Sequence, residues 1–175
     1  MIIHATRKLA ARIPKVSQEP TQEVSALGNW HADRLTLDRR QCVLFCHDET
    51  RAALFIAGLR KPQFAALGGE IFQQLFADTL AALECPQAQL RRALLSLGPC
   101  RFDTATDRSV LSSMRVARQD LEAYLRNFSN VLMMDPAEAS RRLTRRPVSV
   151  RGKHFWPQDR LLELVAGLER MESPT

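Results

Sequence analysis

The side chains best suited to chemistry in this sequence are basic, and they gather near its C-terminal end. Six of them fall in a stretch without a single acidic residue: Arg141, Arg142, Arg145, Arg146, Arg151 and Lys153. The formal net charge of the chain is +6, so this stretch carries the entire excess. Guanidinium groups bind phosphate and carboxylate oxygens in pairs, and a strip of them can follow a nucleic acid backbone. The stretch predicts an interface for nucleic acid, or otherwise for an acidic protein.

A helix must present these arginines, and its start is marked clearly. Asp135 is suited to the cap position, Pro136 to the first turn and Glu138 to the third helical position, and Pro147 must end the helix. At 100° per residue, the four arginines between 141 and 146 span about 140° and share one side. The alternative is a solvated helix face, or one paired with acidic residues of this chain.

Two further places could capture an anion. The first is one end of the predicted meander, where the turn that contains Arg39 and Arg40 and the residues after the third strand, Arg60 and Lys61, lie together. The second is the start of the helix after Asp107, where free backbone N–H groups could bind an anion. Ordinary turns and helix caps explain the same residues. The candidate anion-binding residues are Arg39, Arg40, Arg60, Lys61, Arg108 and Ser109.

An enzyme is the alternative to a binding protein. The candidate catalytic residues are His31, which could act as acid or base near neutral pH, and Asp107. Together with Trp30, Arg39 and Arg40 they would line a pocket for a small anion. The competing interpretation is that Trp30 belongs to the core and His31 is hydrogen-bonded at the sheet edge. The sequence contains no catalytic or phosphate-loop motif that would decide for an enzyme.

The cysteines indicate neither a metal site nor a disulfide framework. Cys42, Cys46, Cys85 and Cys100 include no C-x-x-C pair, and positions i and i+4 of a strand lie about 13 Å apart. The chain has no signal peptide and no apolar run long enough to span a membrane. We therefore expect reduced thiols, no metal, no cofactor, no membrane contact and a cytoplasmic location.

The pattern along the 175 residues predicts a single α+β domain over residues 1–175. Apolar runs at 2–5, 30–37, 41–46 and 52–56, and a further candidate near 100–104, predict an antiparallel sheet of three to five strands, mostly N-terminal. Helical spacing dominates after Pro62 and predicts a layer of about five helices, packed against one face of the sheet. Residues 14–27 are a candidate mobile loop. An exposed strand edge would allow a homodimer.

Several segments in order along the chain together resemble a known family. They are Met1–His4, Gly28–Ala32, Asp38–Phe45, Gly58–Phe64, Asp107–Met114 and Arg141–Pro147, with the pattern W-H-A, D-R-R-x-C-V-L-F, G-L-x-K-P-x-F and R-S-V-L-x-S-M. In these segments the chain is similar to an uncharacterised bacterial domain family, one of the domains of unknown function. The resemblance implies a domain covering most of the chain and implies no activity, cofactor or partner. The residues themselves favour a cytoplasmic binding or accessory protein.

Overall fold

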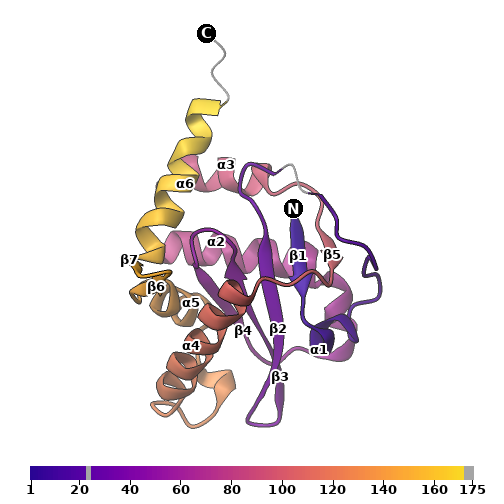
Figure 1. Cartoon of the computed structure of the whole chain (residues 1–175). Helices are drawn as coiled ribbons and strands as arrows, with labels where there is room; N and C mark the ends of the chain where they lie inside the picture. The colour runs from indigo at the N-terminus through magenta and orange to yellow at the C-terminus, as the bar shows by residue number, and fades with distance from the viewer. Residues whose placement is uncertain (23–24, 172–175) are drawn as a thin grey trace.

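The computed structural model describes residues 1–22 and 25–171 and shows an α+β fold, as predicted (Figure 1). The strands are β1 (Ile2–Ala5), β2 (Trp30–Leu37), β3 (Arg40–His47), β4 (Ala53–Ile56), β5 (Arg101–Asp103), β6 (Val148–Val150) and β7 (Lys153–Phe155). The helices are α1 (Arg7–Ala10), α2 (Phe72–Ala82), α3 (Gln87–Ser96), α4 (Arg108–Leu125), α5 (Pro136–Thr144) and α6 (Pro157–Met171), with short helical turns at Lys61–Ala66, Leu67–Ile71 and Val131–Met133.

The main sheet has the strand order β4-β3-β2-β1-β5. Strands β2, β3 and β4 form the antiparallel meander that the sequence predicts. The β2–β3 turn places Asp38 and Arg39 at φ 47° and 61°, the left-handed conformation that suits a tight hairpin. β1 pairs in parallel with both β2 and β5. The connection between β1 and β2 spans residues 6–29, which is long enough for the crossover that a parallel pair requires.

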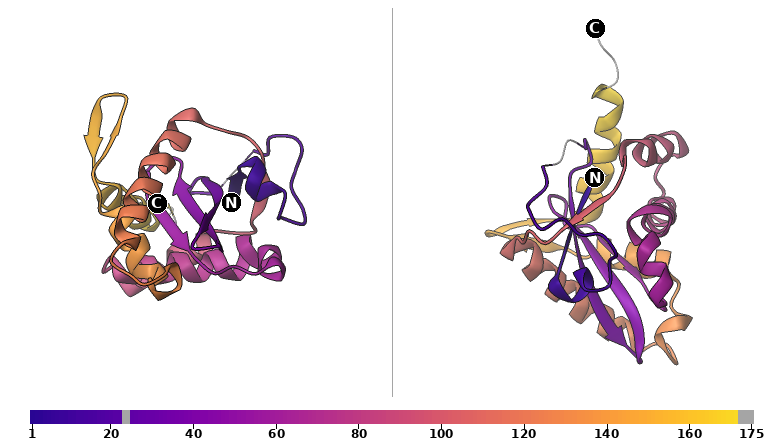
Figure 2. Two further views of the ribbon diagram at one scale, coloured as in Figure 1. Left: turned by 90° about the horizontal axis from the view of Figure 1, so that it is seen from below. Right: turned by 90° about the vertical axis from the view of Figure 1, so that its right-hand side faces the viewer.

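Helices cover both faces of the sheet, whereas the sequence analysis placed them on one (Figure 2). Trp30, Phe45 and Leu54 pack with α2, α3 and α6, while Cys46 and Phe55 on the opposite face pack with α4 and α5. The reason lies in β3, where every residue from 42 to 47 is buried. A continuous apolar run of this kind is typical of a strand buried on both sides.

Helix α5 closes the outer edge of β4 through two hydroxyl groups. Phe55 donates its backbone N–H to Ser140 Oγ at 2.9 Å, and Ala53 donates to Thr144 Oγ1 at 3.1 Å. Thr144 Oγ1 in turn donates to the Ala53 carbonyl oxygen at 3.0 Å. These edge groups are therefore not free to pair with a strand of a second copy.

Aspartates cap both α4 and α5, and the cap at Asp135 is the one that the sequence predicts. Asp135 accepts a hydrogen bond from the Glu138 N–H at 2.7 Å and starts α5. Asp107 accepts from Ser109 N–H at 2.6 Å and from Val110 N–H at 3.2 Å and starts α4. The sequence analysis missed the short helix α1 and the β6–β7 hairpin.

The segment 14–27, predicted as a mobile loop, includes residues 23 and 24, which lie outside the described residues. Elsewhere it contains no helix or strand, but it is anchored to the sheet. Ser17 donates its N–H to the Phe102 carbonyl oxygen at 2.8 Å, and Leu27 is buried.

Cys42, Cys46 and Cys85 are free thiols, and all three are buried. Burial raises the pKa of the Cys46 thiol to about 12, so this thiol is protonated and inert at neutral pH. None of the helices in the described part of the chain combines the length and the apolar character needed to cross a membrane.

Candidate functional site

The arginines of α5 do not form the even strip that the sequence predicts. The helix ends at Thr144, so Arg145 is its C-cap and Arg146 lies beyond it. Helical spacing therefore does not apply to Arg146, because the chain has already turned toward Pro147.

Arg141 is neutralised by a residue of its own helix. Its Nε and Nη2 atoms both donate to the Glu138 carboxylate at 2.6 Å. This bidentate ion pair lowers the pKa of Glu138 and raises that of Arg141. Arg141 is therefore a poor candidate for contact with a partner, which corrects the sequence analysis.

Arg142 and Arg145 remain exposed and available. The Arg142 guanidinium carbon lies 4.6 Å from the centre of the Tyr124 ring on α4, a cation–π distance. Neither arginine forms an ion pair with any residue that the structure describes. Arg142 and Arg145 therefore carry the exposed positive charge at the C-terminal end of α5.

A groove of about 720 Å³ lies between α4 and α5. Its α4 wall includes Asp120 and Tyr124, and its α5 wall includes Arg142, Arg145 and Arg146. The groove is open, and its positive side chains outnumber its acidic one.

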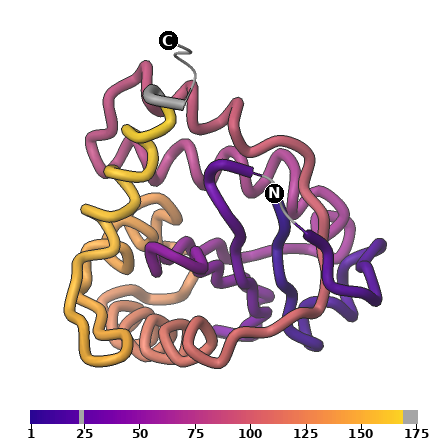
Figure 3. Tube along the Cα trace, turned by 45° about the horizontal axis from the view of Figure 1, so that its top comes forward, coloured from indigo at the N-terminus to yellow at the C-terminus, as the bar shows by residue number. Residues whose placement is uncertain are grey.

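A second cavity, of about 430 Å³, adjoins this groove and shares Val116, Arg146 and Pro147 with it. It lies between α4 and the β6–β7 hairpin, which runs beside α4 (Figure 3). We call it the serine pocket, because its lining includes Ser109, Ser112, Ser113 and Ser149, together with Arg146 and Arg151.

Arg146 is inserted between α5 and α4 rather than pointing into solvent. Its Nη2 donates to the Ser113 carbonyl oxygen at 3.0 Å, and its Nη1 lies 3.6 Å from an oxygen of the half-exposed Asp120. Only 11% of the side chain is exposed, and Nε has no partner among the described residues. Burial lowers the pKa of Arg146, although a guanidinium stays charged at neutral pH.

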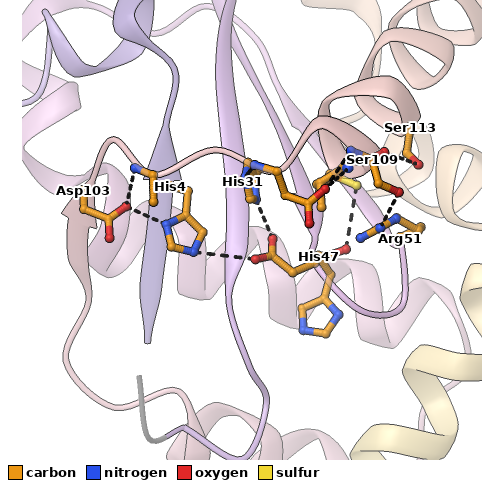
Figure 4. Close-up of polar contacts among 12 residues, drawn as sticks. His4, His31, His47, Arg51, Asp103, Ser109 and Ser113 are labelled. Atoms are coloured by element: carbon orange, nitrogen blue, oxygen red, sulfur yellow. Dashed lines mark hydrogen bonds and ion pairs between the residues drawn. The ribbon is translucent and has the colours of Figure 1, made fainter. Parts of the chain in front are cut away.

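Arg51 is a second buried arginine, which the sequence analysis missed. It is 7% exposed, and its Nη2 donates to Ser109 Oγ at 3.0 Å (Figure 4). Its Nε and Nη1 atoms are buried and have no partner in the described part of the chain. An arginine in a short turn is ordinarily exposed, so nothing in the sequence pattern indicated its burial.

The start of α4 does not offer the free anion site that the sequence suggested for Arg108 and Ser109. The Asp107 carboxylate already accepts the N–H groups of Ser109 and Val110. Burial alone would raise the pKa of Asp107, but these two hydrogen bonds and the charge of Arg51 lower it. Asp107 is thus a cap, and Arg108 is exposed.

His31 lies within a chain of hydrogen bonds. Its Nε2 accepts the Asp107 N–H at 2.9 Å, so the ring proton must be on Nδ1, which faces Asp48 Oδ1 at 2.6 Å. Because both nitrogens are occupied, His31 is not placed to act as a general base, contrary to the enzyme hypothesis.

The chain of hydrogen bonds continues to β1 and β5 (Figure 4). Asp48 Oδ2 lies 3.6 Å from His4 Nε2, and His4 Nδ1 bonds to Asp103, which is fully buried. His4, His31 and Asp48 offer ligand atoms within 4.8 Å of one another, a spacing that could suit a metal. The proton on His31 Nδ1 opposes that use, because a metal needs the lone pair of that nitrogen.

The pocket proposed around Trp30, His31, Arg39 and Arg40 is not formed. Trp30 is buried and packs edge-on against Phe72 of α2. Arg39 and Arg40 are exposed at the opposite end of β2 from His31, about 20 Å away by strand rise, since Arg40 pairs with Leu37.

Arg60 and Lys61 do lie at the same end of the sheet as Arg39 and Arg40. The N–H of Leu59 donates to the Gln41 carbonyl oxygen at 2.9 Å, which brings the two segments together. All four basic side chains are exposed on the surface.

His47 is a buried neutral histidine that should make stability depend on pH. Its Nε2 donates to the Leu27 carbonyl oxygen and its Nδ1 accepts the Thr50 N–H. Burial lowers its pKa below the ordinary 6.5, so the unfolded chain binds this proton more readily than the folded one. The contribution is fully present above about pH 6.5 and is lost as the pH falls toward the lower folded value.

We expect the free energy of unfolding of the native chain to fall as the pH is lowered below about 6.5, measured by urea denaturation. In His47→Gln the fall should be smaller, because glutamine does not titrate. The difference between the two slopes is the contribution of His47. Identical slopes would contradict the prediction.

A family model described as Domain of unknown function (DUF6933) matches residues 2–160. No curated protein matches the chain.

Proposed function

The chain belongs to the DUF6933 family, and we propose from its own residues that it binds nucleic acid along the groove between α4 and α5. The observation that carries the proposal is that Arg142 and Arg145 stand exposed on the groove without a carboxylate partner in the described chain. Exposed, unpaired guanidinium groups on one wall are suited to phosphates spaced along a backbone.

The β6–β7 hairpin extends the positive surface. It projects from the body of the molecule in the left view of Figure 2, and its Arg151 and Lys153 are exposed. A long polyanion lying in the groove would reach these side chains as well. A small anion would contact only one of these places, so the extent of the surface favours a polymer.

We also propose a cytoplasmic location, in keeping with the free thiols of Cys42, Cys46 and Cys85.

Replacing Arg142 and Arg145 together with alanine should weaken binding of a labelled DNA duplex by at least 10-fold at low salt. Each phosphate contact contributes about 0.9 to the slope of log affinity against log salt. The slope should therefore become shallower by about 1.8. Fluorescence anisotropy across a salt series measures both quantities.

The matched control is Arg39→Ala/Arg40→Ala, which removes the same charge from exposed positions that do not line the groove. Binding in this control should be close to that of the native chain. The proposal fails if the two double variants weaken binding equally, or if the native chain does not bind the duplex at low salt.

A further inference from the structure

Arg146, which lines the serine pocket, and Arg51, which donates a hydrogen bond to Ser109 of its lining, are both buried without a hydrogen-bonded carboxylate. Arg51 has two unpartnered nitrogens and Arg146 has one, counting partners among the described residues. The nearest acid to Arg146, Asp120, is 3.6 Å away and half-exposed. Burying a charge without a paired opposite charge is costly. Two such charges beside one cavity indicate that an anion belongs there.

We propose that the serine pocket is a phosphate subsite, which receives one phosphate group of the nucleic acid bound in the adjoining groove. This inference rests on the proposed function, because the groove and the pocket share Arg146 and Val116. A nucleic acid backbone in the groove can therefore place one of its phosphates in the pocket while it stays in contact with Arg146.

The pocket offers donors on two sides. Ser109 and Ser112 lie on one face of α4, and Ser109 Oγ already accepts from Arg51. The Ser109 hydroxyl proton is therefore left to donate elsewhere. Ser149 and Arg151 approach from the hairpin. None of the residues that line the pocket in the described structure is acidic.

The chemistry of the donors favours phosphate over a carboxylate. Hydroxyl and guanidinium donors on two walls can approach the oxygens of a tetrahedral backbone phosphate from different directions, whereas the two oxygens of a carboxylate lie in one plane. The volume of about 430 Å³ leaves space for the atoms attached to the phosphorus.

The test measures the binding of inorganic phosphate to the full chain by calorimetry, with chloride at matched ionic strength as the reference. Saturable binding of phosphate is expected, together with competition between phosphate and the labelled duplex. In Ser109→Ala/Ser149→Ala, phosphate binding should weaken at least 10-fold, because two hydrogen bonds to a charged group are lost. Arg39→Ala/Arg40→Ala, which removes two exposed arginines outside the groove and the pocket, should bind phosphate as the native chain does.

The outcomes separate the two proposals. Duplex binding without saturable phosphate binding, or phosphate binding unchanged in the serine variant, overturns the subsite. Phosphate binding without any duplex binding overturns the nucleic acid proposal and supports a pocket for free phosphate. Phosphate that binds but does not compete with the duplex shows that the pocket does not receive the phosphate of the nucleic acid, which overturns that part of the inference.

Discussion

Replacing Asp103 with alanine is expected to lower the free energy of unfolding by about 3–5 kcal/mol. Asp103 is fully buried, and its two oxygens accept from His4 Nδ1, Thr21 N–H and Ala105 N–H. The variant would leave the buried His4 ring of β1 and two partly buried backbone N–H groups without this acceptor. Since small domains unfold with about 5–15 kcal/mol, the loss would be a large part of the total. Urea denaturation with a constant m-value measures it.

Asp48→Ala is the matched control, because Asp48 also binds a histidine but 27% of its side chain is exposed. Water can replace part of what is lost there, so we expect a cost of about 1 kcal/mol. A double-mutant cycle between Asp103 and His4 should show coupling, because the hydrogen bond between them is lost when either side chain is replaced. An equal cost for the two aspartate variants would contradict a special role for Asp103.

The sequence predicted those helix starts and turns that are determined by neighbouring residues. The caps at Asp107 and Asp135 follow from side chains that accept nearby backbone N–H groups, and they start α4 and α5 where the sequence placed them. The two polar turns of the meander are equally local. The parallel pairing of β1 is not, because it joins Ile3 to Trp30 and Phe102 through the tertiary fold.

The candidate site was predictable in composition but not in geometry. The cluster of arginines could be read from the sequence, and Arg142 and Arg145 are indeed exposed. Whether each guanidinium group is paired, buried or exposed, however, depends on the residues that surround it in the fold. Glu138 is only three residues before Arg141 and could have been foreseen as its partner, whereas Ser113 and Asp120 reach Arg146 from another helix. Arg51 is buried because α4 packs over its turn.

Helix α5 holds its arginines outward because its opposite face is bonded to β4, and removing those bonds should be costly. We expect Ser140→Ala/Thr144→Val to lower the free energy of unfolding by about 2–6 kcal/mol. The loss of each hydroxyl leaves one buried strand N–H unpaired, at Phe55 and at Ala53. A buried donor without an acceptor costs about 1–3 kcal/mol. Urea denaturation of the double variant measures the sum.

Thr79→Val separates this edge effect from the mere loss of a buried helical hydroxyl. Thr79 is as buried as Thr144, but its hydroxyl bonds only to the Leu75 carbonyl oxygen of its own helix. No strand N–H depends on it, so we expect a cost below about 1 kcal/mol. If Thr79→Val cost as much as Thr144→Val, the hydroxyls of α5 would not be replacing a neighbouring strand. The edge of β4 would then be held closed by apolar packing alone, and the outward placement of Arg142 and Arg145 would rest on that packing.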